Sequence, residues 1–494
     1  MQVRLWFEDG GIRLSLDRSS ATDGRSDATS GQEDSASTAT GGQEDSASTA
    51  TTAFDPTTLP GVEPDERTGG YRAPAYRYAA VRDALAGHAA TAATGNDQPT
   101  VTVSDEVAPT FAWDQQLDTR YELRDYQADA LSAWEAADRR GVVELPTGSG
   151  KTVIGLAAIA ACSTPTLVVV PTIDLLEQWR RELRAEFDVP VGQFGGGEQR
   201  AERLTVATYD SAYLKADSVG GDFGLVVFDE VHHLGGAGYR DVARLLAAPA
   251  RLGLTATFER PDDAHEVVEE LLGPVVASAS VDDLAGDHLA EYDLRRIEVD
   301  LTDEEREVYE AAQGTFLEYV RSAGITFRSG SDYQKLVKRS GNDPEAREAL
   351  LAKQRAREVM MNADAKLDEL ADILRRHRGE RTIVFTAHTE LVYRISERFL
   401  IPAITAETGA AERREILDRF REGTYSRVVS ANVLDEGIDV PDAAVGVVLS
   451  GSGSQREFTQ RLGRLLRPGE TNHAVLYELV TSETAEERVS RRRR

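Results

Sequence analysis

Three short polar segments constrain the fold of this 494-residue chain more than any other feature. Residues 146–152 read Pro-Thr-Gly-Ser-Gly-Lys-Thr, residues 229–233 read Asp-Glu-Val-His-His, and residues 460–467 read Gln-Arg-Leu-Gly-Arg-Leu-Leu-Arg. The first two follow apolar runs that are typical of buried strands. A glycine turn at the start of a helix presents backbone amides that bind phosphate. The order and the wide spacing of the three segments predict a nucleotide site between two lobes.

The apolar pattern predicts the fold class. From residue 121 onward, short apolar runs alternate with helical stretches such as 153–161 and 175–187, and the same alternation resumes near residue 382. This rhythm is typical of parallel sheets covered by helices, so we expect an α/β fold with two lobes. The predicted strands are 141–145, 167–170, 204–207, 225–228 and 252–254 in the first lobe, and 382–385, 403–406, 427–430, 444–449 and 474–480 in the second.

Changes in composition set the expected domain boundaries. Residues 1–115 are expected to form a small α+β module that starts with a hairpin of strands at 3–7 and 11–16. Within this module, residues 18–52 contain one decapeptide twice, and a repeat without apolar periodicity predicts a disordered insertion. The first lobe is expected at 116–295, a charged helical insert at 300–360, the second lobe at 361–485 and a basic tail at 486–494.

The charge balance indicates the environment of the protein. The formal net charge is −28, and only six residues are lysine. This balance favours adaptation to a salt-rich cytosol, although an acidic protein from a GC-rich gene would look similar. Cys162 is the only cysteine, which excludes a disulfide scaffold within one chain. Because the chain shows neither a signal peptide nor an apolar run of about 18 residues, we expect a cytoplasmic protein.

The glycine-rich segment has the residue types that a nucleotide phosphate requires. The turn formed by Thr147, Gly148, Ser149 and Gly150 is expected to direct its amides at phosphate oxygens. Lys151 would neutralise the β- and γ-phosphates, and Thr152 would ligate Mg²⁺, so the expected cofactors are ATP and Mg²⁺. The strict pattern fails at its first position, where Leu145 replaces glycine. The alternative is an ordinary glycine turn.

Two further elements complete the expected nucleotide site of the first lobe. Asp229 would hold Mg²⁺ through water, and Glu230 would orient and deprotonate the attacking water. Gln127, upstream, would present its amide to the adenine edge. An acidic pair at the end of a strand can also be simply polar, but its position 78 residues after Lys151 (229 − 151) favours the catalytic interpretation.

The third segment supplies two arginines from the second lobe. Arg464 and Arg467 are three residues apart, so they would share one face of a helix and could reach the γ-phosphate when the lobes close. Gly437 and Asp439, in the preceding polar stretch, are expected to contact the nucleotide and favour this interpretation. The alternative is a solvated arginine-rich helix.

Together these motifs resemble those of the superfamily 2 helicases, and most closely the XPB family of DNA repair and transcription helicases in its archaeal form. The resemblance covers about residues 121–485 and includes Gly-Leu-Thr-Ala-Thr at 253–257 and Val-Leu-Asp-Glu-Gly-Ile-Asp-Val-Pro at 433–441. It implies two RecA-like lobes, a DNA-damage-recognition-like module at the N-terminus, a thumb-like insert and ATP-dependent movement on DNA, typically 3′ to 5′. The family carries Arg-Glu-Asp where this chain has Arg260-Pro261-Asp262, so strand separation is less secure than translocation.

The expected DNA contacts lie in the insert. Residues 321–357 contain nine basic and four acidic residues, a local excess of +5 (9 − 4) in a chain of net charge −28. Such an excess favours non-sequence-specific binding of phosphate, and the alternative is a solvated helical face. The candidate DNA-binding residues are Arg321, Arg328, Lys335, Lys338 and Arg339.

These observations leave three readings of function open. The first is an ATP-dependent DNA helicase or double-strand translocase in nucleotide excision repair or transcription. The second is another superfamily 2 motor, either an RNA helicase or a restriction-type translocase. The third is an ATP-switched DNA clamp that recruits a repair nuclease. Pro261 is the residue that favours this third interpretation. A monomer without membrane association is expected in each case.

Overall fold

The computed structural model describes residues 1–17, 54–94, 102–236, 238–258, 265–284, 291–327, 330–431, 443–450 and 473–487. The chain divides into two compact units. The first unit contains residues 1–142, 155–253 and 259–276, and the second contains 143–154, 254–258 and 277–494. In the described part of the chain, no helix has the length and the apolar character that crossing a membrane demands.

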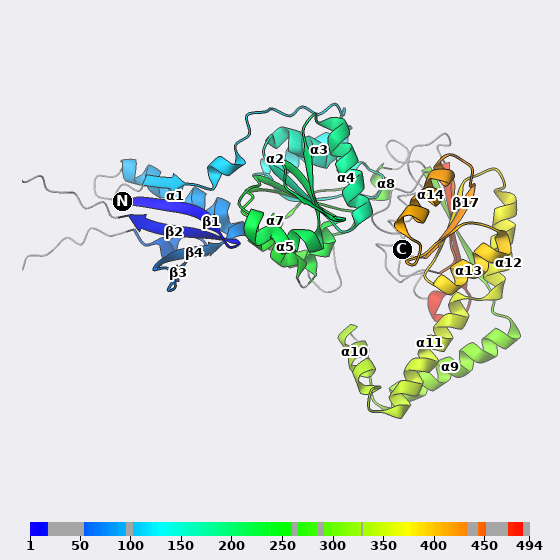
Figure 1. The fold of residues 1–494 in the computed structure, drawn as a ribbon. Helices are drawn as coiled ribbons and strands as arrows, with labels where there is room; N and C mark the ends of the chain where they lie inside the picture. The colour runs from blue at the N-terminus through cyan, green and yellow to red at the C-terminus, as the bar shows by residue number, and fades with distance from the viewer. Residues whose placement is uncertain are drawn as a thin grey trace, which may run out of the picture. The chain divides into compact units, whose positions relative to one another are not determined.

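The N-terminal module is a small sheet with one helix (Figure 1). Its strands run in the order β3-β4-β2-β1-β5. Strands β1 and β2 pair antiparallel around Asp9 and Gly10, whose φ angles of 50° and 69° form the tight turn that the sequence predicted. In β1 the alternate residues Val3 and Leu5 are buried, and they belong to one apolar cluster with Val81 and Leu85 of α1. The bounds are β1 Gln2–Glu8, β2 Gly11–Asp17, β3 Glu63–Asp65, β4 Gly70–Pro74, α1 Tyr78–Thr94 and β5 Thr102–Asp105.

The first lobe contains an eight-stranded sheet in the order β13-β6-β12-β11-β7-β10-β8-β9. Strand β7 pairs parallel with both β10 and β11. All five strands expected in this lobe are present, and β8, β9 and β13 are additional. The strands are β6 Arg140–Glu144, β7 Thr166–Val170, β8 Val191–Gly195, β9 Glu198–Arg200, β10 Leu204–Thr208, β11 Leu225–Asp229, β12 Ala250–Thr255 and β13 Val275–Ser278.

Helices cover this sheet on both faces (Figure 1). Helix α4 illustrates why they form, because Thr172 caps its first turn and its apolar residues Leu176, Trp179 and Leu183 recur at helical spacing and are buried. The helices are α2 Asp125–Ala136, α3 Lys151–Cys162, α4 Ile173–Glu186, α5 Tyr209–Val219, α6 Tyr239–Leu245, α7 His265–Leu272 and α8 Val281–Leu284.

The second lobe is a six-stranded sheet in the order β14-β19-β18-β15-β17-β16, and its neighbouring strands pair parallel. We expected the first lobe to reach residue 295, but β14 pairs with β19 from Glu291 onward, so the chain has entered the second sheet by then. Its bounds are β14 Glu291–Val299, α12 Asp364–Arg376, β15 Thr382–Thr386, α13 Thr389–Phe399, β16 Ala403–Ile404, α14 Ala410–Arg421, β17 Arg427–Ala431, β18 Val445–Val448 and β19 His473–Thr481.

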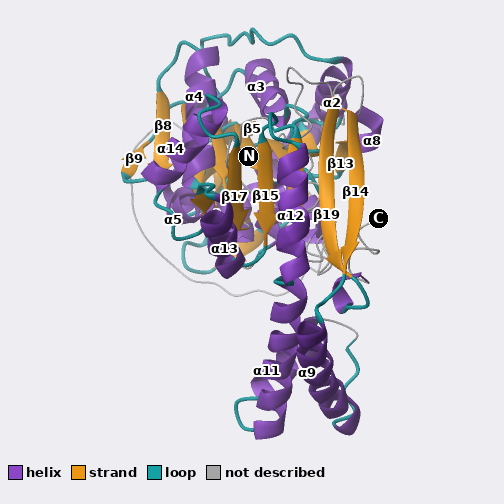
Figure 2. Ribbon diagram, turned by 90° about the vertical axis from the view of Figure 1, so that its right-hand side faces the viewer, coloured by secondary structure: helices purple, strands orange, loops and turns teal. Residues whose placement is uncertain are grey.

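Three helices form the insert between β14 and α12: α9 Asp303–Ser322, α10 Gly330–Arg339 and α11 Pro344–Met361. Helices α9 and α11 lie side by side (Figures 1 and 2). Thr302 and Glu305 form a reciprocal cap at the start of α9, and Asp343 accepts two backbone hydrogen bonds at the start of α11. These caps stabilise the ends of highly charged helices, and two small apolar clusters pack the helices of the insert against one another.

Several residues singled out from the sequence lie outside the described residues. These are the repeat-containing segment 18–52, the departure Arg260-Pro261-Asp262, Arg328 of the insert, Gly437 and Asp439, the arginines Arg464 and Arg467, and the end of the tail from 488 to 494.

Candidate functional site

The glycine-rich loop connects β6 to α3, as the sequence predicted. Gly148 and Gly150 have φ angles of 87° and 81°, which side-chain-bearing residues rarely adopt, so both positions require glycine. Ser149 is buried and its hydroxyl donates to the carbonyl of Pro146 over 2.7 Å, which closes the loop on itself. Helix α3 begins at Lys151, so the loop ends at a helix N-terminus.

Lys151 lies over this loop. Its ammonium donates to the carbonyl oxygens of Leu145 at 3.0 Å and Pro146 at 3.3 Å. These bonds hold the positive charge at the mouth of the loop, and phosphate oxygens would be stronger acceptors than neutral carbonyls. Thr147 has a buried hydroxyl for which the structure shows no hydrogen-bond partner among the described residues. A buried hydroxyl of this kind could form a hydrogen bond with a phosphate oxygen.

The acidic pair stands at the end of β11. Asp229 is 6% exposed, and its Oδ2 accepts from the indole Nε1 of Trp179 at 2.7 Å while its Oδ1 accepts from the backbone N–H of Glu230 at 3.0 Å. Two donors therefore fix the orientation of this carboxylate. Trp179 was not singled out from the sequence, because a tryptophan on an amphipathic helix normally indicates core packing.

Glu230 occupies the left-handed region with φ 48° and ψ 52°. A non-glycine residue there is uncommon and costs about 1–3 kcal/mol, a strain that clusters at functional sites. The turn directs the side chain toward His232, whose Nδ1 lies 3.4 Å from a Glu230 carboxylate oxygen. The Glu230 side chain is 13% exposed. It thus keeps limited access to solvent beside the buried Asp229, as a residue that orients water requires.

Tyr209 contacts the backbone at the end of β11. Its hydroxyl donates to the Asp229 carbonyl at 3.3 Å, and its ring lies 5.1 Å from that of Tyr239. Burial and the nearby charges of Asp229 and Glu230 raise the pKa of Tyr209 well above its usual value, so the hydroxyl stays protonated and remains a donor.

Gln127 has a structural role that the sequence did not indicate. It is the third residue of α2, and its Oε1 accepts from the backbone N–H of Arg124 at 3.0 Å. This bond caps the helix and fixes the side chain, which is 4% exposed. The contact with adenine stays a prediction.

The order of strands relates the loop to the acidic pair. Strand β12 lies between β6 and β11 in one sheet. The N–H of Leu145 donates to the Thr255 carbonyl at 2.9 Å, and Glu144 accepts from the N–H of Phe258 at 2.8 Å. The Gly-Leu-Thr-Ala-Thr segment that ends β12 therefore borders the glycine loop. The structure does not describe Arg464 or Arg467, so their part in the site stays a prediction.

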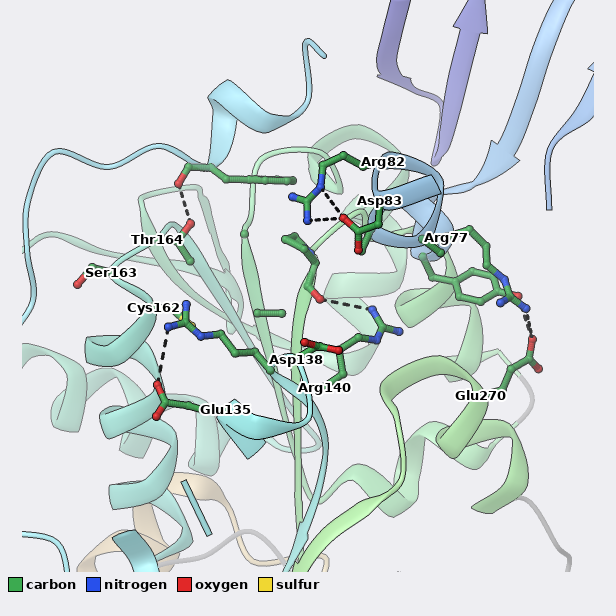
Figure 3. Close-up of a pocket in the computed structure, with 18 residues that line it drawn as sticks. Arg77, Arg82, Asp83, Glu135, Asp138, Arg140, Cys162, Ser163, Thr164 and Glu270 are labelled. Atoms are coloured by element: carbon green, nitrogen blue, oxygen red, sulfur yellow. Dashed lines mark hydrogen bonds and ion pairs between the residues drawn. The ribbon is translucent and has the colours of Figure 1, made fainter. Parts of the chain in front are cut away.

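A large cavity of the first unit is a separate feature (Figure 3). Its volume is about 910 Å³, and its walls come from the N-terminal module and from the opposite ends of the strands that carry the candidate site, including Arg140 and Pro249. Arg77 pairs with Glu270 at 3.2 Å, and Arg82 pairs with Asp83 at 3.0 Å. Because these cations are matched by carboxylates, the cavity lacks the positive excess that a phosphate ligand requires.

The candidate DNA-binding side chains of the insert are exposed in part. Lys335, 75% exposed, pairs with Asp332 at 3.0 Å, and Arg339, 52% exposed, pairs with Asp343 at 3.0 Å. Arg321 and Lys338 are exposed as well. Exposed ion pairs of this kind contribute only about 0–1 kcal/mol, so phosphate can compete for both cations.

Comparison with known families agrees with this arrangement. Residues 120–260 match the family described as the type III restriction enzyme res subunit, and residues 365–469 match the helicase conserved C-terminal domain. Residues 46–92 match the xeroderma pigmentosum group B helicase damage recognition domain.

Two individual proteins are similar to this chain over most of its length. The chain is 46% identical over 375 residues to the DNA 3′-5′ translocase XPB2 of Sulfurisphaera tokodaii, which covers 76% of this chain and 85% of that protein. It is 33% identical over 384 residues to the putative DNA 3′-5′ helicase Rad25 of Halobacterium salinarum, which covers 76% of this chain but only 57% of that protein. Among solved structures, the Hef helicase domain of Pyrococcus furiosus has a TM-score of 0.49 at 20% identity, covering 75% of this chain and 98% of that one.

A glycine loop at a helix N-terminus and an acidic strand end lie in one α/β lobe, and a second parallel lobe matches the helicase conserved C-terminal domain; together these features place the chain among the ATP-using helicases. Within that class, two findings indicate the family: the match to the xeroderma pigmentosum group B damage recognition domain and the 46% identity to the translocase XPB2. The chain belongs to the XPB family, and it is a DNA-dependent ATPase of the helicase type.

Proposed function

We propose that this chain uses ATP hydrolysis to translocate on double-stranded DNA in the 3′ to 5′ direction, in nucleotide excision repair or transcription. The observation that carries the proposal is the fixed carboxylate of Asp229 beside the strained Glu230, at the end of β11. This strand belongs to the same sheet as β6, the strand that precedes the glycine loop. The translocase named above supplies the polarity by analogy, and the damage recognition match favours repair.

The roles of the residues follow from their chemistry. Lys151 and the amides of the 147–150 turn would hold the phosphates, and the Thr147 hydroxyl would gain a partner there. Thr152 and Asp229 would bind Mg²⁺, which neutralises charge on the phosphates. Glu230 would hold the attacking water and accept its proton. Arg464 and Arg467 would complete the site from the second lobe.

The insert would hold the DNA through its exposed cations. We propose that Lys335 and Lys338 on α10 bind phosphates, because both are exposed and belong to a stretch with a local excess of positive charge in an acidic chain. Phosphate contacts carry no base information, so binding would be independent of sequence.

Replacing Lys335 and Lys338 by glutamate should weaken DNA binding by a similar factor on all sequences. The slope of log affinity against log salt should become shallower by about 0.9 for each lost contact on duplex DNA. ATPase without DNA should be unchanged, while DNA stimulation falls. Fluorescence anisotropy across a KCl series measures the affinity and the slope. The matched control replaces both lysines by arginine, which keeps the two positive charges, and it should bind DNA as the wild type does. An unchanged slope in the glutamate variant would mean that α10 is a solvated surface that does not bind DNA.

Assembly and location are part of the same proposal. We propose a monomer that acts in the cytoplasm and hands opened or remodelled DNA to a repair nuclease. The alternative is a clamp that binds DNA under ATP control without moving, which Pro261 favours because proline cannot replace the glutamate that the family carries there.

A further inference from the structure

A cluster of aromatic rings on the insert surrounds one lysine. The Lys353 ammonium, on α11, lies 4.0 Å from the ring centroid of Tyr333 on α10, 5.1 Å from that of Phe316 on α9 and 5.6 Å from that of Phe327. Phe316 and Phe327 stack with an interplanar angle of 18° and a centroid distance of 6.1 Å. Three separate segments thus meet at this lysine, so the rings are held in place from several sides.

The cluster is open to solvent on one side. Tyr333 and Phe327 are each 39% exposed, whereas Phe316 is 7% exposed and belongs to the core of the insert. Large rings that pack on a buried partner but stay partly in water are a feature of sites that bind apolar ligands. The exposed parts of Tyr333 and Phe327 are therefore candidates for contact with a flat apolar ligand.

Next to this cluster lies a cavity with positive charge. Its volume is about 690 Å³, and Tyr333, Lys353, Arg347, Arg357 and His388 line it. Burial and the charge of Arg357 lower the pKa of both Lys353 and His388 from their usual values, so His388 is mainly neutral near pH 7. Glu358, the carboxylate in this wall, accepts from Gln354 at 2.9 Å. Three cations against one carboxylate suit an anionic ligand.

We propose that Tyr333 and Phe327 form a stacking site for an unpaired base of single-stranded DNA, whose phosphate reaches Arg347 and Arg357 in the adjoining cavity. This inference rests on the proposed action on DNA and deepens it by adding a contact with an unpaired base to the phosphate contacts that the insert would make on duplex DNA. A base inside a duplex already stacks on both faces, so only an unpaired base can use an aromatic ring. A ring beside a cation is the recurrent arrangement for binding single strands without sequence preference.

The test compares strands with and without bases. Tyr333→Ala should weaken binding of an oligothymidylate about tenfold, as loss of one stacked base implies. The same substitution should leave binding of an abasic strand of equal length unchanged, because that strand keeps only the phosphates. Duplex affinity should also be unchanged. Tyr333→Phe keeps the ring and should bind as the wild type, and Phe327→Leu provides a second variant that removes a ring while keeping an apolar side chain.

The readouts separate this proposal from the proposed function. A 2-aminopurine base in the strand should be quenched by wild type and Tyr333→Phe but not by Tyr333→Ala, with thermal unfolding confirming that each variant folds. Equal losses on the oligothymidylate and the abasic strand, or no loss on either, would overturn the stacking site. Movement on duplex DNA is assayed without single strands, so its failure in the wild type would contradict translocation and leave the stacking result standing.

Discussion

Glu230→Gln should bind ATP as the wild type does and hydrolyse it about 10²–10⁴ times more slowly, the range expected when a general base is removed. Glutamine matches the size of glutamate and tolerates the same backbone, so the left-handed turn at φ 48° is kept. It cannot accept a proton from water. Phosphate release under steady-state conditions measures turnover, and a fluorescent ATP analogue measures binding.

A neutralising substitution elsewhere provides the control for Glu230→Gln. Glu177, on α4, is 43% exposed and lies 3.9 Å from Arg180, so Glu177→Gln removes one charge from the same lobe without touching the strand end. Its turnover should equal that of the wild type. Near-normal turnover in Glu230→Gln itself would remove this residue from the proposed role, and loss of ATP binding would show that the substitution damages the fold.

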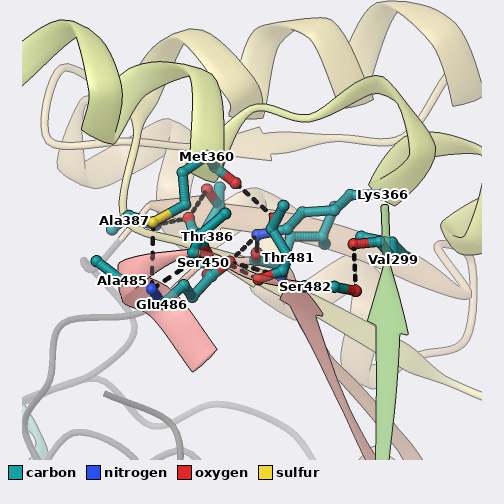
Figure 4. A network of polar contacts seen from close by, with 12 residues as sticks. Val299, Met360, Lys366, Thr386, Ala387, Ser450, Thr481, Ser482, Ala485 and Glu486 are labelled. Atoms are coloured by element: carbon teal, nitrogen blue, oxygen red, sulfur yellow. Dashed lines mark hydrogen bonds and ion pairs between the residues drawn. The ribbon is translucent and has the colours of Figure 1, made fainter. Parts of the chain in front are cut away.

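Lys366→Met should lower the free energy of unfolding by about 3–5 kcal/mol, the cost of removing one partner of a buried ion pair. Lys366 is 0% exposed, and its ammonium donates to the Leu449 carbonyl and to Glu486 Oε2, each at 2.7 Å (Figure 4). The same Glu486 oxygen accepts from the Thr481 N–H at 3.0 Å. Without the ammonium, the Glu486 carboxylate is buried with its charge uncompensated.

Two further variants isolate the charge effect at Lys366. Adding Glu486→Gln to Lys366→Met removes the unpaired charge, so the double variant should be more stable than Lys366→Met alone. Lys335→Met, on a side chain that is 75% exposed, should stay within about 0.5 kcal/mol of the wild type. Urea unfolding at fixed KCl measures all three. A double variant less stable than Lys366→Met would contradict the ion-pair explanation.

The strands that the sequence revealed are those with uninterrupted apolar runs. Strand β11 is buried at every position and was predicted almost to the residue. Strand β8 was missed because its five residues include Gly192, Gln193 and Gly195, a composition typical of a turn. The buried Gln193 amide donates to the Gly195 carbonyl at 2.8 Å and accepts from Arg180, and no local pattern predicts these contacts. Strand β14 was missed because five of its nine residues are charged, a composition that an edge strand tolerates but that does not read as an apolar run.

The candidate site was predictable in its residue types but not in its supports. The glycine loop and the acidic pair stand out because phosphate chemistry demands particular residues at particular spacings. The contact of Trp179 with Asp229 joins residues 50 apart and depends on how α4 packs on the sheet. Glu486 was assigned to the basic tail, yet it is 5% exposed inside the second lobe. Long-range contacts of this kind follow from the fold and not from the sequence near each residue.

Displacement of a third strand from a DNA triplex tests the central claim, ATP-driven movement along duplex DNA, most directly. In molar KCl, the wild type should release the third strand in an ATP-dependent manner, at a rate that falls with the length of duplex to be crossed. Lys151→Ala should release none, because it removes the ammonium that caps the glycine loop. DNA-stimulated ATP hydrolysis without any release of the third strand would contradict translocation and identify the protein as an ATP-switched clamp.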